Sequence, residues 1–147
     1  MGDNAKVVKA LEKLLADTYT LYLKTQNYHW NVTGPSFNSL HTLFQTQYED
    51  MILANDLIAE RIRTLGEKAP GSFAAFLKTT SIKEESGNPK ANEMVKNLAQ
   101  DQETLVRSAQ AVLDAAQENG DDPTVDLAIG RMEIHQKNQW MLNAHLE

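Results

Sequence analysis

Residues 29–66 read HWNVTGPSFNSLHTLFQTQYEDMILANDLIAERIRTLG, and this stretch decides the fold. Its first part ends one helix, because residues 31–35 combine a glycine with a proline. From Ser36, a candidate helix cap, the stretch continues to Gly66, a residue type that typically ends helices. Between them apolar side chains recur at near-heptad spacing, at Leu40, Phe44, Met51, Ile58, Ile62 and Leu65. The spacing predicts a long amphipathic helix over residues 36–66.

The rest of the chain continues this helical pattern on both sides. Apolar residues from Val7 to His29 predict a helix before the turn. Asn88-Pro89 and Asp121–Pro123 each place a cap residue before a proline, which predicts the starts of two further helices. Residues 71–79 predict a short apolar helix inside the long connection between helices two and three. We therefore predict an all-α four-helix bundle, formed by one domain of 147 residues, with a crossover that carries the short extra helix.

Composition limits the classes of function. The net charge of -6 opposes binding to phosphate backbones and favours cations. No apolar run approaches the length of a membrane span, and residues 1–6 lack the apolar stretch of a secretory signal. The absence of cysteine excludes disulfides and thiolate metal sites. We expect a cytoplasmic protein that binds no membrane.

Four side chains within the deciding stretch are candidate metal ligands. They are His29, His41, Asp56 and Glu60. The two carboxylates are four residues apart and so share one helix face. Imidazole nitrogen with carboxylate oxygen suits iron(II), zinc or manganese. The alternative is that the histidines are capping or core groups and the carboxylates form a solvated face with neighbouring arginines.

Helix geometry separates these candidates into two half-sites. His41 and Asp56 are 15 residues apart, which is roughly 22 Å along a helix, so one chain cannot place both on one ion. His29 can fold back near His41 across the turn. If the helix pairs antiparallel with its copy about an axis between Tyr48 and Glu49, His41 meets the partner's carboxylates. No histidine follows a glutamate by three residues, which disfavours a di-iron centre within one chain.

Several motifs together resemble the Dps family, the DNA-protecting proteins of starved cells, also called miniferritins. The motifs are His29-Trp30-Asn31-Val32-Thr33-Gly34, Leu40-His41, Asp56-x-x-Ala59-Glu60-Arg61 and Leu65-Gly66. The resemblance covers nearly the whole chain. It implies a ferritin-like bundle, a hollow dodecamer, and ferroxidase sites at two-fold interfaces. Iron(II) would be oxidised preferentially by hydrogen peroxide and stored as ferric mineral, with zinc as a candidate competitor.

The resemblance also assigns the ligands: His29 and His41 come from one chain, and Asp56 and Glu60 from its partner. Gln45 departs from the pattern, because the family has an acidic residue there. An amide is a weaker ligand than a carboxylate, so we expect a second iron to bind poorly. Trp30 resembles a radical-quenching tryptophan of the family, with core packing as the alternative. Three acidic residues resemble the lining of iron-entry pores, with helix capping as the alternative: Asp121, Asp122 and Asp126.

Two other functions remain as alternatives. The first is a nucleoid-associated protein that protects DNA by coating it. The short N-terminus with Asp3 and the lack of a basic tail disfavour direct DNA binding. The second is a structural oligomer without metal chemistry, which Gln45 alone supports.

Overall fold

The structure, a computed structural model, describes residues 4–147, and these form helices and no strand. A short helix, α3 (Phe73–Thr79), accompanies four long ones: α1 (Ala5–Asn31), α2 (Phe37–Thr64), α4 (Ala91–Glu118) and α5 (Asp122–His145). The predicted four-helix bundle with a short extra helix is therefore confirmed. Asp3, whose charge entered the expectation about DNA, lies outside the described residues.

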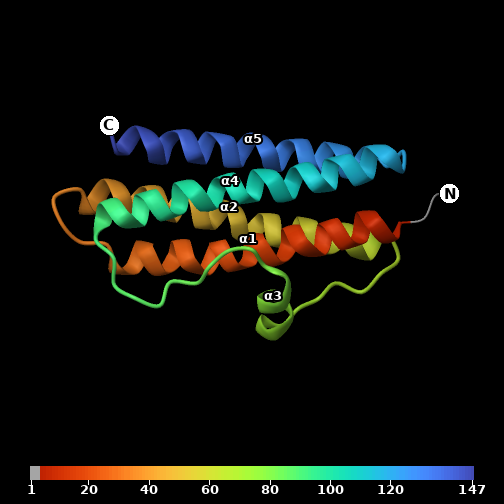
Figure 1. The fold of residues 1–147 in the computed structure, drawn as a ribbon, viewed down its shortest axis with the longest axis horizontal. Helices are drawn as coiled ribbons and strands as arrows, with labels where there is room; N and C mark the ends of the chain where they lie inside the picture. Colours follow the sequence, from red (N-terminus) through yellow and green to blue (C-terminus); the bar gives the residue numbers. More distant parts are fainter. Residues whose placement is uncertain (1–3) are drawn as a thin grey trace.

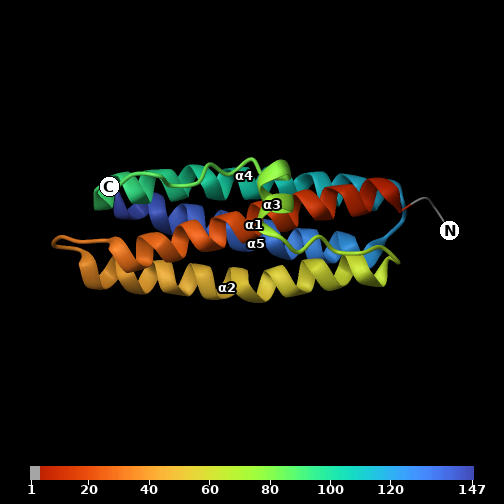
Figure 2. The same ribbon diagram turned by 90° about the horizontal axis from the view of Figure 1, so that it is seen from below.

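The long helices form two pairs that pack on each other (Figure 1). α1 packs on α2, α4 packs on α5, and α1 also packs on α4. Because α2 and α4 run in the same direction, residues 65–90 must return along the length of the bundle, and α3 lies midway along this path (Figure 2). None of the helices among residues 4–147 is long and apolar enough to cross a membrane.

Two of the predicted helix limits are confirmed. α2 ends as expected, since Gly66 has a φ of 96° and the N–H of Glu67 donates to the carbonyl of Ile62 at 3.3 Å. Glycine adopts this left-handed conformation without strain, and the six-residue hydrogen bond is typical of a Schellman end. α5 begins within the predicted Asp121–Pro123 signal, and its cap is Asp121, whose carboxylate accepts the N–H of Thr124 at 3.2 Å.

Two predicted caps are wrong. Pro89 is not the first residue of α4, because the chain remains extended to Lys90 and the helix begins at Ala91. The fixed φ of proline suits extended backbone as well as a first helical turn, so the Asn88-Pro89 signal was ambiguous. Ser36 occupies the cap position of α2, but its side chain makes no capping hydrogen bond.

A buried carboxylate fastens the crossover to the bundle. Asp17 on α1 is fully buried and accepts hydrogen bonds from the hydroxyl of Thr80 at 2.7 Å and the N–H of Ser81 at 2.6 Å. The hydroxyl of Ser108 on α4 and the ammonium of Lys13 also donate to it, each at 2.6 Å. The crossover is thus held by charge-assisted hydrogen bonds as well as by apolar packing.

A second polar network joins α2, α4 and α5. Arg131 on α5 donates to both carboxylate oxygens of Asp50 on α2, at 3.2 and 2.9 Å, and contacts His135 Nε2 at 3.1 Å. His135 Nδ1 lies 2.6 Å from the side-chain oxygen of Gln102. Since an amide oxygen only accepts, Nδ1 carries the proton and Nε2 accepts from Arg131. His135 is therefore a neutral structural residue without a free nitrogen.

This network predicts an acid-sensitive fold. Burial, and then the charge of Arg131, hold the pKa of His135 well below its ordinary value of 6.5. The unfolded chain takes up this proton near pH 6.5 and the folded chain does not, so stability is full above pH 6.5. It should fall below that pH by up to about 1.4 kcal/mol per pH unit. Thermal unfolding at several pH values should show this slope in the parent and a flatter one in His135→Gln, whereas the control His145→Gln should keep it.

Candidate metal centre

The structure brings His29 and His41 together, as the turn between α1 and α2 predicted. Their rings stack with centroids 3.8 Å apart and an interplanar angle of 12°. Gly34 permits this hairpin, since its φ of 106° favours glycine. The two imidazoles thus form one unit at the junction of the helices.

Each histidine fixes the proton position of the other. His29 Nδ1 lies 2.7 Å from the backbone carbonyl of His41, and His41 Nδ1 lies 2.7 Å from the carbonyl of His29. A carbonyl can only accept, so each Nδ1 must carry a proton and donate it. In a neutral ring this leaves Nε2 with a free electron pair, which is the form that binds a metal ion. The pair therefore fits the nitrogen half of an iron(II), zinc or manganese site.

Two aromatic rings hold the histidine pair in place, and sequence reasoning missed both. Phe37 stacks on His41 with centroids 4.9 Å apart, and the ring of Tyr48 lies edge-on to His29 at 5.2 Å. Phe37 begins α2, four residues before His41, so the i,i+4 rule could have suggested its contact. The contact between Tyr48 and His29 joins two helices and has no local signal.

The two candidate carboxylates are exposed and unpaired within residues 4–147. Neither Asp56 nor Glu60 has a side-chain hydrogen bond or ion pair there. The neighbouring arginines turn elsewhere: Arg61 pairs with Asp121 at 2.9 Å, and Arg63 donates to a backbone carbonyl at 3.1 Å. These arginines therefore do not pair with Asp56 or Glu60 within residues 4–147, and the two carboxylates face solvent there. Both oxygens of each carboxylate remain available to a cation.

His41 lies in the first half of α2, with His29 of α1 beside it, whereas Asp56 and Glu60 lie in the second half of α2. Among residues 4–147, no three histidine, aspartate or glutamate side chains gather to hold a metal ion. Helix rise puts His41 and Asp56 roughly 22 Å apart. The chain therefore carries a nitrogen donor pair and an oxygen donor pair, and each is incomplete alone.

Gln45 lies one turn after His41 and is half-buried. Its amide nitrogen donates to the carboxylate of Glu49 at 2.7 Å. This hydrogen bond orients the amide. It also brings the acidic side chain of Glu49 next to the position where the Dps pattern has an acidic residue, although sequence reasoning named Glu49 only as a neighbour of the two-fold axis. Glu49 remains exposed.

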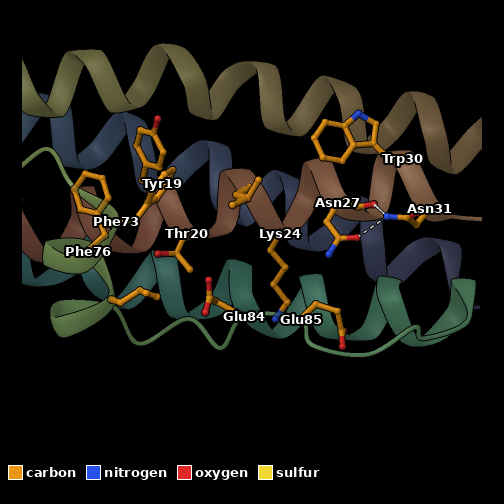
Figure 3. A pocket seen from close by; sticks show the side chains of 12 residues that line it. Tyr19, Thr20, Lys24, Asn27, Trp30, Asn31, Phe73, Phe76, Glu84 and Glu85 are labelled. Atoms are coloured by element: carbon orange, nitrogen blue, oxygen red, sulfur yellow. Dashed lines mark hydrogen bonds between the residues drawn. The ribbon is translucent and has the colours of Figure 1, made fainter.

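Trp30 is not a core residue of this chain, since 60% of its surface is exposed. It lies at one end of a groove of about 560 Å³ between α1 and the crossover (Figure 3). Tyr19, Phe73 and Phe76 lie at the other end of this groove. The alternative of core packing for Trp30 therefore does not apply within one chain.

The three acidic candidates for a pore differ in their surroundings. Asp121 is mostly buried, caps α5 and pairs with Arg61, so its carboxylate is already engaged. Asp122 and Asp126 are exposed in the first turn and a half of α5. Capping accounts for Asp121, and the other two remain free to face a cation path.

Large apolar side chains are exposed on several helices. They include Ile52, Leu53 and Leu57 of α2 and Phe73 and Leu77 of α3. Ile52 and Phe73 line a second groove, of about 570 Å³, together with Asp56. α5 also exposes large apolar side chains, namely Ile129, Trp140 and Met141. Exposed apolar patches of this kind typically mark protein–protein contacts.

The similarity to known proteins extends over nearly the whole chain. The sequence profile of the ferritin-like domain matches residues 8–147. A low temperature-induced protein of Nostoc sp. is 43% identical over 143 residues, which cover 96% of this chain and 80% of that protein. The DNA protection during starvation protein of Brevibacillus brevis is 36% identical over 141 residues, covering 96% of this chain and 95% of that protein.

Solved structures also have a similar fold. One of them is the crystal structure of a DPS protein from Vibrio cholerae O1, described as a member of a broad superfamily of ferritin-like diiron-carboxylate proteins. It matches with a TM-score of 0.93 at 35% identity, and the match covers 98% of this chain and 91% of that chain.

Proposed function

We propose that this chain, which belongs to the Dps family of ferritin-like proteins, is a ferroxidase that oxidises iron(II) and stores the ferric product. The name of the Vibrio cholerae relative, which mentions diiron-carboxylate proteins, supports iron as the metal. One observation carries the proposal: the two histidines each bond the other's backbone carbonyl through Nδ1 and so keep Nε2 free for a metal. Zinc would compete for the same donors.

The site is shared between two chains. His29 and His41 of one chain bind the iron substrate together with Asp56 and Glu60 of the partner subunit, related by a two-fold axis near Tyr48 and Glu49. Two facts support this sharing: within the part of the chain that the structure describes the carboxylates are unpaired, and Asp56 lines a groove beside exposed apolar residues. An isologous contact about such an axis makes two identical sites.

Hydrogen peroxide is the preferred oxidant, and the product is kept in the cavity of a dodecamer. A closed shell needs more than one kind of contact, and the chain exposes large apolar side chains on α2, on α3 and on α5. Asp122 and Asp126 line the pore through which iron(II) enters the shell, at a symmetry axis other than the two-fold axis of the metal site. Removing iron(II) and peroxide together protects the cell from oxidative damage.

Stopped-flow measurement of iron(II) oxidation tests this activity. The intact protein should oxidise iron(II) faster with hydrogen peroxide than with oxygen, and His29→Ala/His41→Ala should be slow with either. Equal rates for the parent and the variant would contradict the proposal.

Direct protection of DNA is the second candidate, favoured by the name of the Brevibacillus brevis relative. The net charge of -6 per chain opposes it, because repulsion from phosphates grows with the number of chains in the assembly. A gel shift at several salt concentrations separates the two functions. Submicromolar, salt-sensitive binding to duplex DNA without divalent ions would favour this second function.

Gln45 predicts one strong iron position per site. Carboxylates bind iron(II) as charged donors, whereas the Gln45 amide offers a neutral oxygen, so a second position, nearer His29, should be weaker. Gln45→Glu should raise its affinity about tenfold, which corresponds to about 1.4 kcal/mol. Titration calorimetry with iron(II) under anaerobic conditions measures this. Two equally tight irons in the parent, unchanged in Gln45→Glu, would show that Gln45 does not affect the metal.

A further inference from the structure

Three tyrosines form a continuous series of ring contacts that begins at the histidine pair. Tyr48 lies edge-on to His29 with centroids 5.2 Å apart. The ring of Tyr22 lies 6.0 Å from that of Tyr48, and Tyr19 lies 5.6 Å from Tyr22. The series ends where Tyr19 stacks on Phe76 at 4.9 Å. It therefore joins the candidate metal site to the short helix α3 through rings in contact.

The chemistry of these rings changes along the series. A phenol can lose one electron together with its proton, whereas a phenyl ring is much harder to oxidise. The last oxidisable ring is therefore Tyr19, beside Phe76. All three tyrosines are half-buried within one chain. Electron transfer slows exponentially with the gap between donor and acceptor, and gaps between rings in contact are small.

We propose that Tyr48, Tyr22 and Tyr19 form a relay that carries one-electron oxidising equivalents away from the histidine pair. The inference rests on the proposed function, because iron(II) and peroxide at that site supply the oxidant. When iron(II) reduces peroxide by one electron, it yields iron(III), hydroxide and a hydroxyl radical. That radical and the phenol of Tyr48 give water and a tyrosyl radical. Tyr22 and then Tyr19 each pass on an electron and a proton, which restores the phenol before it.

The relay ends at the surface of the chain. Tyr19 lines both the groove of about 560 Å³ in Figure 3 and the second groove of about 570 Å³. A small one-electron reductant, such as ascorbate or a thiol, can supply an electron there, and a proton from water completes the phenol. The radical is thereby transferred from the neighbourhood of His29 and His41, where it would oxidise the metal-binding side chains, to Tyr19, where it can be reduced.

The fourth tyrosine of the chain is a matched control. Tyr28 precedes His29 in sequence, but its ring packs on Phe44, with centroids 6.3 Å apart. Its hydroxyl donates to Glu85 and accepts a hydrogen bond from Asn97 at 3.1 Å. Burial, and then the hydrogen bond to Glu85, raise the pKa of Tyr28 far above 10. Tyr28 is therefore an oxidisable ring outside the series.

Freeze-quench electron paramagnetic resonance on iron-loaded protein mixed with peroxide tests the relay. The parent, Tyr48→Phe, Tyr22→Phe and Tyr28→Phe are compared, with iron(II) oxidation followed in the same samples and a peroxide-only blank. The substitutions to phenylalanine keep the rings, and calorimetry of iron binding in each variant shows whether its metal site is intact. A parallel series in Trp30→Phe separates tyrosyl from tryptophanyl signals.

We expect a tyrosyl signal in the parent that falls by more than half in Tyr48→Phe, although three tyrosines remain, and that is unchanged in Tyr28→Phe. Tyr22→Phe should confine the signal to Tyr48 and change its hyperfine pattern. Equal losses in Tyr48→Phe and Tyr28→Phe, or normal iron oxidation without a tyrosyl signal, would overturn the relay alone. Failure of peroxide to oxidise iron(II) in the parent would instead overturn the proposed function and the relay with it.

Discussion

Mixing two inactive variants should restore iron oxidation. His29→Ala/His41→Ala lacks the nitrogen donors, and Asp56→Ala/Glu60→Ala lacks the oxygen donors, so each alone should lose nearly all of the peroxide-driven rate. In a mixed dimer, one site combines the intact histidines of one chain with the intact carboxylates of the other. Random mixing then restores about a quarter of the sites, because half of the dimers are mixed and each has one complete site. Stopped-flow rates on unfolded and refolded mixtures measure this recovery.

The control is the same pair of variants mixed without unfolding, so that chains do not exchange. That mixture should stay inactive. If a refolded assembly, shown by mass spectrometry to contain both chains, remained inactive, the two half-sites would not come from different chains. Substantial activity of either variant alone would exclude the corresponding residues as ligands.

Asp17→Ala should cause the largest loss of stability. Its fully buried carboxylate accepts hydrogen bonds from α4 and from the crossover, so removal leaves the Ser108 and Thr80 hydroxyls and the Ser81 N–H without their acceptor. Breaking a buried charged network by removing one member costs about 3–5 kcal/mol. Denaturant unfolding measures the change, and proteolysis within residues 65–90 should become faster.

The matched control is Asp114→Ala, another aspartate with a hydrogen bond but on an exposed position of α4. It should change stability by less than about 0.5 kcal/mol. Equal stability of Asp17→Ala and Asp114→Ala would show that apolar packing alone holds the crossover. Failure of Asp17→Ala to accumulate as folded protein, while Asp114→Ala does, agrees with the expectation.

The apolar periodicity and the helix-ending residues were enough to predict the bundle. Gly66 ends α2 and α5 starts within Asp121–Pro123 as expected, because these signals act within one turn of the chain. The start of α4 was misplaced because Pro89 fits extended backbone equally well. The polar groups of the core, such as Asp17 and His135, could not be predicted, since their partners come from distant helices.

In the candidate site, too, the sequence predicted the local features but not those that depend on distant residues. The short turn at Gly34 was sufficient to predict that His29 and His41 would meet. Their reciprocal bonds to backbone carbonyls depend on the angle between α1 and α2, which the sequence does not reveal. Whether Arg61 would neutralise Glu60 was equally undecided, because its partner Asp121 is 60 residues away.

Crystals of the protein soaked in iron(II) without oxygen, with diffraction recorded on both sides of the iron absorption edge, test the shared site most directly. We expect anomalous density between His29 and His41 of one chain and Asp56 and Glu60 of a chain related by two-fold symmetry. The stronger peak should lie at the carboxylates and His41. Iron bound within a single chain, or density that leaves the carboxylates uncoordinated, would contradict the account.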